Sequence, residues 1–89
     1  MVKTFKLQVV TPEKQHISEE VTFVTLPGLV GEFGVLPGHA PLLAALKTGV
    51  MKVEKDRESK NYRIGGGYAE VDGNDVIVLA ESLTELGTK

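Results

Sequence analysis

Cysteine and tryptophan are absent from the 89 residues of the chain, and only four prolines and five aromatic residues occur. Without cysteine the chain forms no disulfide, no thiolate metal site, no cysteine nucleophile and no iron–sulfur cluster, which fits a reducing compartment. No apolar run approaches the roughly 18–20 residues that span a bilayer, because the longest reaches only from Ala40 to Leu46. Lysines interrupt the segment from Met1 to Leu7, which therefore lacks the apolar part of a signal peptide. The sequence predicts neither a transmembrane segment nor export by a signal peptide.

Neither sign of charge dominates the chain. Ten Lys and Arg residues stand against twelve Asp and Glu residues, for a net charge of -2. Such a balance gives no basic field to attract phosphates, so nucleic acid is not an expected partner. The share of hydrophobic residues is 42% and that of charged residues 25%, as in soluble globular proteins rather than disordered or fibrous ones. A chain of this length has one core, and residues 1–89 are predicted to form a single β-sandwich domain.

Short runs with apolar residues at alternate positions recur along the chain, which is typical of β-strands. Gly, Pro, Asn or Asp bounds each run, and this regular spacing favours an all-β sandwich or barrel. Asp72, Gly73 and Asn74 predict a tight hairpin between the last two runs. Only residues 41–47 and 81–86 are compatible with a short helix. The predicted strands cover residues 5–9, 21–26, 33–36, 42–46, 50–55, 61–64, 68–72 and 75–80, with a polar strand-like stretch at 14–18.

Glycines gather in two segments. Gly65, Gly66 and Gly67 precede an alternating strand and not a helix, so a phosphate-binding loop is not predicted. Close approach of two backbones or a β-bulge explains them instead. The glycines between residues 28 and 38 lack the spacing of a dinucleotide-binding motif. They predict a shaped loop with positive φ angles at Gly28, Gly31, Gly34 and Gly38.

Charged residues are distributed unevenly. Glu32 and Lys47 are the only ones between residues 21 and 51, whereas residues 52–63 hold eight. In a sandwich about every second strand residue faces outward, so part of the apolar segment is expected at the surface, where an apolar patch indicates a protein contact. The alternative is that its apolar residues fold into the core. The four residues in question are Leu29, Val30, Phe33 and Leu36.

Few residues are suited to catalysis. His16 lies in a polar stretch where an exposed side chain is expected, and His39 lies in a rigid turn between two prolines. Neither has a second histidine or a carboxylate cluster at the spacing of a metal site, and no nucleophilic triad is evident. The sequence therefore predicts no catalytic residue, no cofactor and no metal. An alternative function is that of a carrier or ligand-binding sandwich, in which Lys47 in a turn would carry the attached group.

One segment is specific enough to suggest a family. From Gly31 to Leu43 the chain reads Gly-Glu-Phe-Gly-Val-Leu-Pro-Gly-His-Ala-Pro-Leu-Leu. This segment resembles the Gly-Glu-Leu-Gly-Ile-Leu-Pro-Gly-His-Ala-Pro-Leu-Leu motif in the N-terminal β-sandwich domain of the epsilon-subunit family of F-type ATP synthases, whose mitochondrial counterpart is called delta. Stretches at residues 7–12, 66–71 and 75–81 agree as well, so the resemblance covers nearly the whole chain.

The resemblance implies a sandwich of two antiparallel sheets with about ten short strands. It implies a non-catalytic rotor subunit of the central stalk that binds the gamma subunit and the c ring and couples proton translocation to ATP synthesis. Such a subunit is peripheral to the membrane through its partners, at the cytoplasmic face of the bacterial plasma membrane or, alternatively, the stromal face of the chloroplast thylakoid. The implied c-ring contact is Gly31, Glu32, Phe33 and Gly34, and the implied gamma-subunit contact is Pro37, Gly38, His39, Gly65, Gly66 and Glu70.

One part of the family pattern has no counterpart in this sequence. Bacterial members usually continue into a two-helix, alanine-rich arm that restrains ATP hydrolysis and in some species binds ATP. The sequence stops at Lys89 and contains neither that arm nor its nucleotide-binding motif. Inhibition and ATP sensing are therefore not expected of these residues.

Overall fold

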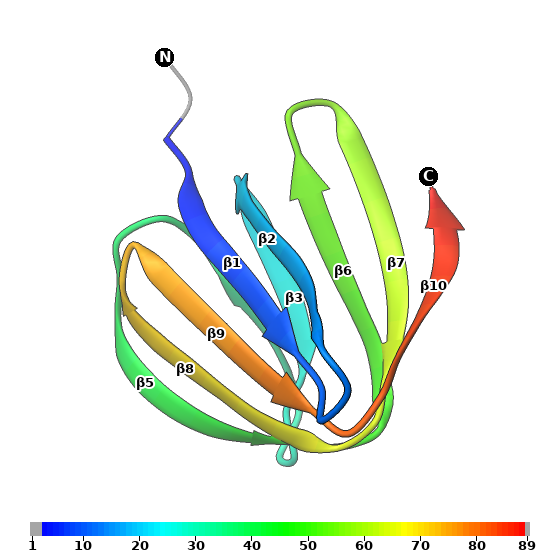
Figure 1. The fold of residues 1–89 in the computed structure, drawn as a ribbon. Helices are drawn as coiled ribbons and strands as arrows, with labels where there is room; N and C mark the ends of the chain where they lie inside the picture. The colour runs from blue at the N-terminus through cyan, green and yellow to red at the C-terminus, as the bar shows by residue number, and fades with distance from the viewer. Residues whose placement is uncertain (1–2, 89) are drawn as a thin grey trace.

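The computed structural model describes residues 3–88, and its ten strands form two packed sheets (Figure 1). No helix occurs within these residues, so the predicted all-β sandwich is confirmed. The two segments that were compatible with a short helix, residues 41–47 and 81–86, both lie mostly in strands. The strands are β1 (Phe5–Val10), β2 (Gln15–Val21), β3 (Phe23–Pro27), β4 (Glu32–Val35), β5 (His39–Leu46), β6 (Gly49–Lys55), β7 (Glu58–Ile64), β8 (Gly67–Gly73), β9 (Asp75–Ala80) and β10 (Leu83–Thr88).

Each sheet contains five strands. Sheet A has the order β2-β1-β9-β8-β5, and sheet B has the order β10-β7-β6-β3-β4. All neighbouring strands are antiparallel except β1 and β9, which run parallel. In this sheet β1 lies between its hairpin partner β2 and β9, a strand from the far end of the chain. The edge strands β4 and β5 follow each other in sequence, so the segment between them passes from sheet B to sheet A.

The core lies between the two sheets and follows directly from the alternation in the sequence. In β1 the side chains of Phe5, Leu7 and Val9 are buried, whereas Lys6 faces outward and Gln8 is only partly covered. Burial of each large apolar side chain stabilises the fold by about 1.5–3 kcal/mol. The other buried apolar residues are Ile17, Val21, Val24, Leu26, Val35, Leu46, Met51, Val53, Tyr62, Ile64, Ala69, Val71, Val76, Val78 and Ala80.

Tyr62 is the one tyrosine of this core, and burial raises the pKa of its hydroxyl above 10.0, with further contributions from the carboxylates of Glu85 and Glu19. The folded state therefore holds this proton more tightly than the unfolded state. The resulting stability is fully present below about pH 10 and is lost as the pH rises through the folded pKa.

We expect the free energy of unfolding to fall less steeply for Tyr62→Phe than for the wild type as the pH rises above about 10. Phenylalanine keeps the ring in the core but has no proton to lose. Urea denaturation at a series of alkaline pH values measures the difference between the two slopes. Identical slopes would mean that Tyr62 does not couple ionisation to folding.

Two segments that pass from one sheet to the other lie side by side. Residues 65–66 lead from β7 to β8, and residues 81–82 lead from β9 to β10. The Gly65 N–H donates to the Ser82 carbonyl over 3.1 Å, and the Glu81 N–H donates to the Gly66 carbonyl over 3.1 Å. At the start of β8, a Cβ on Gly67 would overlap the carbonyl oxygen of Leu79. The predicted close approach of two backbones is thus confirmed at Gly67.

The turns gather at two opposite ends of the sandwich, which we call the lower pole and the upper pole as they stand in Figure 1. The register of β5 and β8 fixes which turns share an end, since His39 pairs with Gly73 and Leu46 pairs with Gly67. The lower pole comprises residues 11–14, 28–31, 47–48, 65–66 and 81–82, and the upper pole comprises residues 36–38, 56–57 and 73–74.

Candidate docking surfaces

The apolar segment at residues 21–51 does reach the surface. Leu29, Val30 and Leu36 are exposed, as the surface interpretation predicted. Phe33 instead packs against the core, so the alternative interpretation holds for this residue alone. The exposed side chains lie in the loop between β3 and β4 and in the turn after β4, and each of these was a predicted contact region.

The loop of residues 28–31 has a fixed shape because several backbone hydrogen bonds anchor it to β5. The Leu29 N–H donates to the Ala45 carbonyl over 2.9 Å, and the Lys47 N–H donates to the Pro27 carbonyl over 2.9 Å. Within the loop the Gly31 N–H donates to the Gly28 carbonyl over 3.2 Å. Glu32 follows as the first residue of β4, and its side chain is exposed. A carboxylate is therefore presented to solvent from a well-anchored segment.

Three of the four predicted positive φ angles in this region were wrong. Gly38 has φ +79°, whereas Gly28, Gly31 and Gly34 do not adopt this conformation. Gly28 and Gly34 are explained by packing instead. A Cβ on Gly28 would lie 2.5 Å from the Gly31 carbonyl oxygen and 2.9 Å from the Phe33 ring, and one on Gly34 would lie 2.6 Å from the Phe23 ring. The absence of a side chain at these two positions makes room for the two aromatic rings, and the Phe33 ring packs against the core.

The turn that presents His39 joins β4 to β5 at the upper pole. The His39 N–H donates to the Leu36 carbonyl over 3.2 Å, and the Gly38 N–H donates to the Asn74 side-chain oxygen over 3.2 Å. His39 itself is half-buried, with its Nδ1 2.7 Å from the Ala40 carbonyl oxygen. The bond from Gly38 to Asn74 ties the turn to the hairpin between β8 and β9, and the other two bonds hold His39 in place.

We expect Gly38→Val to lower the midpoint of thermal unfolding by about 5–15 °C, because a left-handed backbone conformation costs a side-chain-bearing residue about 1–2 kcal/mol. Gly31→Val is the control, since Gly31 has no positive φ and a Cβ there would meet nothing within 4 Å. Calorimetry of both variants measures the difference. An unchanged midpoint for Gly38→Val would contradict the turn geometry.

The six residues of the implied gamma-subunit contact do not form one compact cluster. Pro37, Gly38 and His39 lie at the upper pole, whereas Gly65 and Gly66 lie at the lower pole. β5 spans the distance between the poles with eight residues, or about 25 Å at about 3.3 Å per residue. Glu70 lies between the two groups, where it pairs with Leu43 of β5 and Ile77 of β9. A single surface that includes all six must extend along sheet A.

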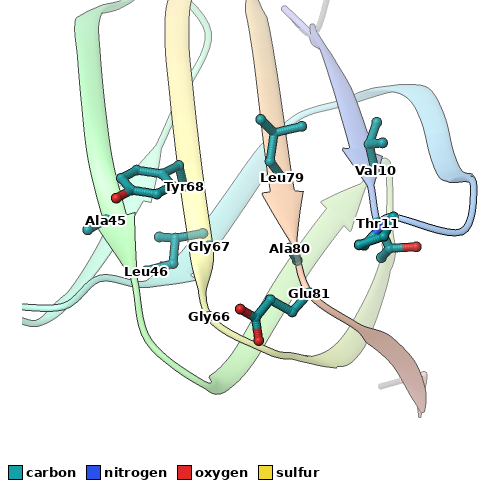
Figure 2. A pocket seen from close by; sticks show the side chains of 11 residues that line it. Val10, Thr11, Ala45, Leu46, Gly66, Gly67, Tyr68, Leu79, Ala80 and Glu81 are labelled. Carbon is teal, nitrogen blue, oxygen red and sulfur yellow. The ribbon is translucent and has the colours of Figure 1, made fainter.

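Four apolar side chains stand side by side on the outer face of sheet A, close to the lower pole (Figure 2). Ala45 pairs with Tyr68, Tyr68 pairs with Leu79, and Leu79 pairs with Val10, so one residue comes from each of four neighbouring strands. We call Val10, Ala45, Tyr68 and Leu79 the apolar row. It lines an open groove of about 640 Å³ whose rim includes Thr11, Gly66 and Glu81.

The same face becomes acidic toward the upper pole. Glu70, Asp72 and Asp75, which we call the acidic cluster, line a second groove of about 340 Å³ together with Gln8 and Ile77. Asp72 and Asp75 pair directly across the β8–β9 hairpin. The outer face of sheet A therefore has an apolar end and an acidic end. Of the seven residues in the apolar row and the acidic cluster, only Glu70 was predicted from the sequence as a contact residue.

Groups that could perform chemistry are scattered. His16 contacts the hydroxyl of Thr11 through its Nε2 over 2.8 Å at the lower pole, whereas His39 lies at the upper pole. Within residues 3–88 no three His, Asp or Glu side chains are placed to hold a metal ion. The described part of the chain also has no helix that is long and apolar enough to cross a membrane. The surface features fit protein contacts better than a catalytic pocket.

Comparison with known proteins identifies the family of the chain. Residues 4–85 match the family described as the beta-sandwich domain of the ATP synthase delta/epsilon chain. The chain belongs to the ATP synthase delta/epsilon family. The resemblance seen at Gly31–Leu43 is thereby confirmed over most of the sequence.

Two curated relatives illustrate the match to this delta/epsilon family. The chain is 48% identical over 83 residues to the ATP synthase epsilon chain of Chlorobium limicola, and the alignment covers 92% of this chain and 94% of that one. It is 45% identical over 82 residues to the ATP synthase epsilon chain of Desulforamulus reducens, with 92% of this chain covered but only 62% of the relative. The family thus contains members close to this length and members that are considerably longer.

Solved structures carry the same fold. A chain of the Euglena gracilis mitochondrial ATP synthase, in a structure of OSCP, F1 and c-ring, matches with a TM-score of 0.87 and 26% identity over 92% of this chain and 53% of that one. A chain from the central stalk and c-ring of the Tetrahymena thermophila mitochondrial ATP synthase matches with a TM-score of 0.78 and 16% identity, covering 91% and 66%. Because its identity is only 16%, the match to the Tetrahymena chain supports the fold alone.

Proposed function

We propose that this delta/epsilon-family chain is a non-catalytic rotor subunit of an F-type ATP synthase. It binds the gamma subunit and the c ring in the central stalk and couples proton translocation to ATP synthesis. The observation that carries this proposal is the 48% identity to an epsilon chain over nearly the whole length of both proteins. The likeness to a chain of an assembly that contains F1 and a c-ring supports the same function.

The architecture suits a part that transmits torque. Two sheets that share one close-packed core deform little under load, because side chains at interior density have no free space to move into. We place the subunit at the cytoplasmic face of a bacterial plasma membrane, held there through its partners. The bacterial origin of the curated relatives supports this location.

The proposed c-ring contact is the segment Gly31–Gly34, at the edge of sheet B. Glu32 is its charged residue, and its exposed carboxylate accepts hydrogen bonds from polar or cationic loops of the ring. The backbone bonds that anchor residues 28–31 limit the entropy lost when the loop docks. For the gamma subunit we propose contacts at Pro37, Gly38, His39, Gly65, Gly66 and Glu70.

We expect Glu32→Lys to reduce the rate of proton-driven ATP synthesis severalfold in membrane vesicles that carry the variant as their only epsilon chain. An exposed charge contributes little to folding, so the free energy of unfolding should change by less than about 0.5 kcal/mol. Glu58→Lys is the matched control, because this exposed residue starts β7 at the tip of a hairpin at the upper pole. Normal ATP synthesis by Glu32→Lys would contradict the proposed contact, as would loss of the folded β spectrum.

A further inference from the structure

We propose that Asn74 is a positioning residue: it holds the turn of residues 36–39 so that His39 keeps one ring orientation and presents its Nε2 as a hydrogen-bond acceptor. Asn74 lies in the tip between β8 and β9, and Gly38 of the turn is 36 residues away in the sequence. The inference goes beyond the proposed function and does not depend on it, because it concerns the chain alone.

The first argument is that Asn74 joins three segments at the upper pole. Its side-chain oxygen accepts a hydrogen bond from the Gly38 N–H over 3.2 Å, and its backbone carbonyl accepts one from the Lys6 N–H over 2.8 Å. Gly38 lies in the turn from β4 to β5, whereas Lys6 lies in β1. One residue of a hairpin tip therefore holds two segments that are distant from it in the sequence.

The second argument is that the turn needs a contact from outside to fix its shape. Within the turn the His39 N–H donates to the Leu36 carbonyl over 3.2 Å. Gly38 has φ +79°, but glycine adopts positive and negative φ with about equal ease, so the residue itself does not select this conformation. Among the described residues, the acceptor for the Gly38 N–H is the Asn74 side chain. That bond favours the observed turn over other conformations open to glycine.

The third argument is that the hairpin tip does not require an asparagine at position 74. Gly73 and Asn74 lie between Asp72 and Asp75, which pair with each other. Gly73 has φ +66°, whereas Asn74 has no positive φ. A two-residue turn with a positive φ only at its first position needs glycine only there. The side-chain oxygen of Asn74 is thus explained by its bond to the neighbouring turn.

The fourth argument concerns the ring of His39. Its Nδ1 lies 2.7 Å from the Ala40 carbonyl oxygen. A carbonyl oxygen only accepts, so Nδ1 carries the proton, and in the neutral ring Nε2 is then an acceptor. Because this bond joins adjacent residues, it depends on the backbone conformation directly after the turn. The residue that fixes the turn therefore also fixes which ring nitrogen of His39 is left to accept a hydrogen bond.

Amide hydrogen exchange of the full chain, followed by NMR, tests the bond to Gly38. We expect the Gly38 amide to exchange about three- to tenfold faster in Asn74→Ala and Asn74→Ser, since one hydrogen bond is lost. Serine suits turns but has a shorter side chain, so it separates turn preference from the bond. Asn74→Asp keeps an acceptor oxygen at the same distance from the backbone and should retain the protection. The Lys6 amide, which bonds to the backbone carbonyl of Asn74, is the internal control.

The state of the His39 ring is the second readout, and a general loss of stability does not change it in the folded protein. NMR of ¹⁵N-labelled imidazole at about pH 8.5, where histidines are ordinarily neutral, reports which nitrogen carries the proton. We expect the proton on Nδ1 in the wild type and in Asn74→Asp, and a mixture of both forms in Asn74→Ala and Asn74→Ser. The chain has two histidines, so His16→Gln assigns the signals.

Three results would overturn the inference. The first is wild-type exchange of the Gly38 amide in both Asn74→Ala and Asn74→Ser. The second is equal acceleration at Gly38 and Lys6 in all three variants, Asn74→Asp included, which would assign the effect to the hairpin as a whole. The third is a wild-type His39 ring with its proton on Nε2. None of these results bears on the proposed function, because no partner takes part in the measurements.

Discussion

Gly67→Val is expected to lower the free energy of unfolding by more than about 4 kcal/mol, a large part of the total of about 5–10 kcal/mol for a chain of this size. A Cβ at this position would overlap the carbonyl oxygen of Leu79 and lie within 3.0 Å of the Cα of Ala80. These atoms belong to the backbone of β9, which pairs with β8 and cannot move without breaking sheet A. Urea denaturation followed by circular dichroism measures the loss.

Two other glycines provide a graded control for Gly67→Val. A Cβ on Gly66 would lie 3.2 Å from the Leu46 carbonyl oxygen, and one on Gly31 would meet nothing within 4 Å. The loss of stability should therefore decrease from Gly67→Val through Gly66→Val to Gly31→Val. Equal stability of the three variants would show that β8 and β9 do not approach as closely as described.

Leu26→Ala is expected to lower the free energy of unfolding by about 3 kcal/mol and the unfolding midpoint by about 10–20 °C. The Leu26 side chain has no exposed surface, so its removal loses burial and leaves a cavity between the sheets. Leu26 also pairs with Phe33 of β4. Loss of the Leu26 side chain is therefore expected to loosen β4, the strand that presents Glu32. Chemical denaturation at constant temperature and calorimetry measure the two quantities.

Leu43→Ala is the control for the cavity argument. It removes the same atoms from a strand residue that is 71% exposed, and it should change the free energy of unfolding by less than about 1 kcal/mol. A loss at Leu43 as large as that at Leu26 would contradict the described placement of the core.

The strands could be predicted because most of them alternate between buried and exposed residues. The tail could not, since Glu81–Leu86 contains residues that favour a helix as readily as a strand. In the structure Leu83 packs against the core beside β7, where it pairs with Ile64. This tertiary contact, which no local pattern reports, selects the strand and overrides the local propensity.

The two candidate docking surfaces differ in how much of each could be predicted from the sequence. The loop with Glu32 lies in one continuous motif, so its residues could be found by reading along the chain. The apolar row combines Val10, Ala45, Tyr68 and Leu79 from four strands. Only the register of those strands, one of them parallel to its neighbour, brings the four side chains together. Alternation alone leaves open which outward-facing residues are neighbours.

The glycines show the same limit of prediction from the sequence, since their roles depend on how the strands pair. A glycine in a turn and a glycine beneath an aromatic ring look alike in a sequence. Gly38 does adopt a positive φ, but Gly34 makes room for the ring of Phe23 and Gly28 for that of Phe33. Those contacts depend on how β3 and β4 pair, which sequence analysis did not establish.

The most direct test of the central claim is co-elution of the purified chain with its own gamma subunit on a sizing column, with the mass of the eluted species measured by light scattering. The account predicts a stable one-to-one complex at micromolar concentrations, without any added nucleotide. Separate elution of the two proteins under these conditions, with both folded, would contradict the assignment of this chain as a rotor subunit that binds the gamma subunit.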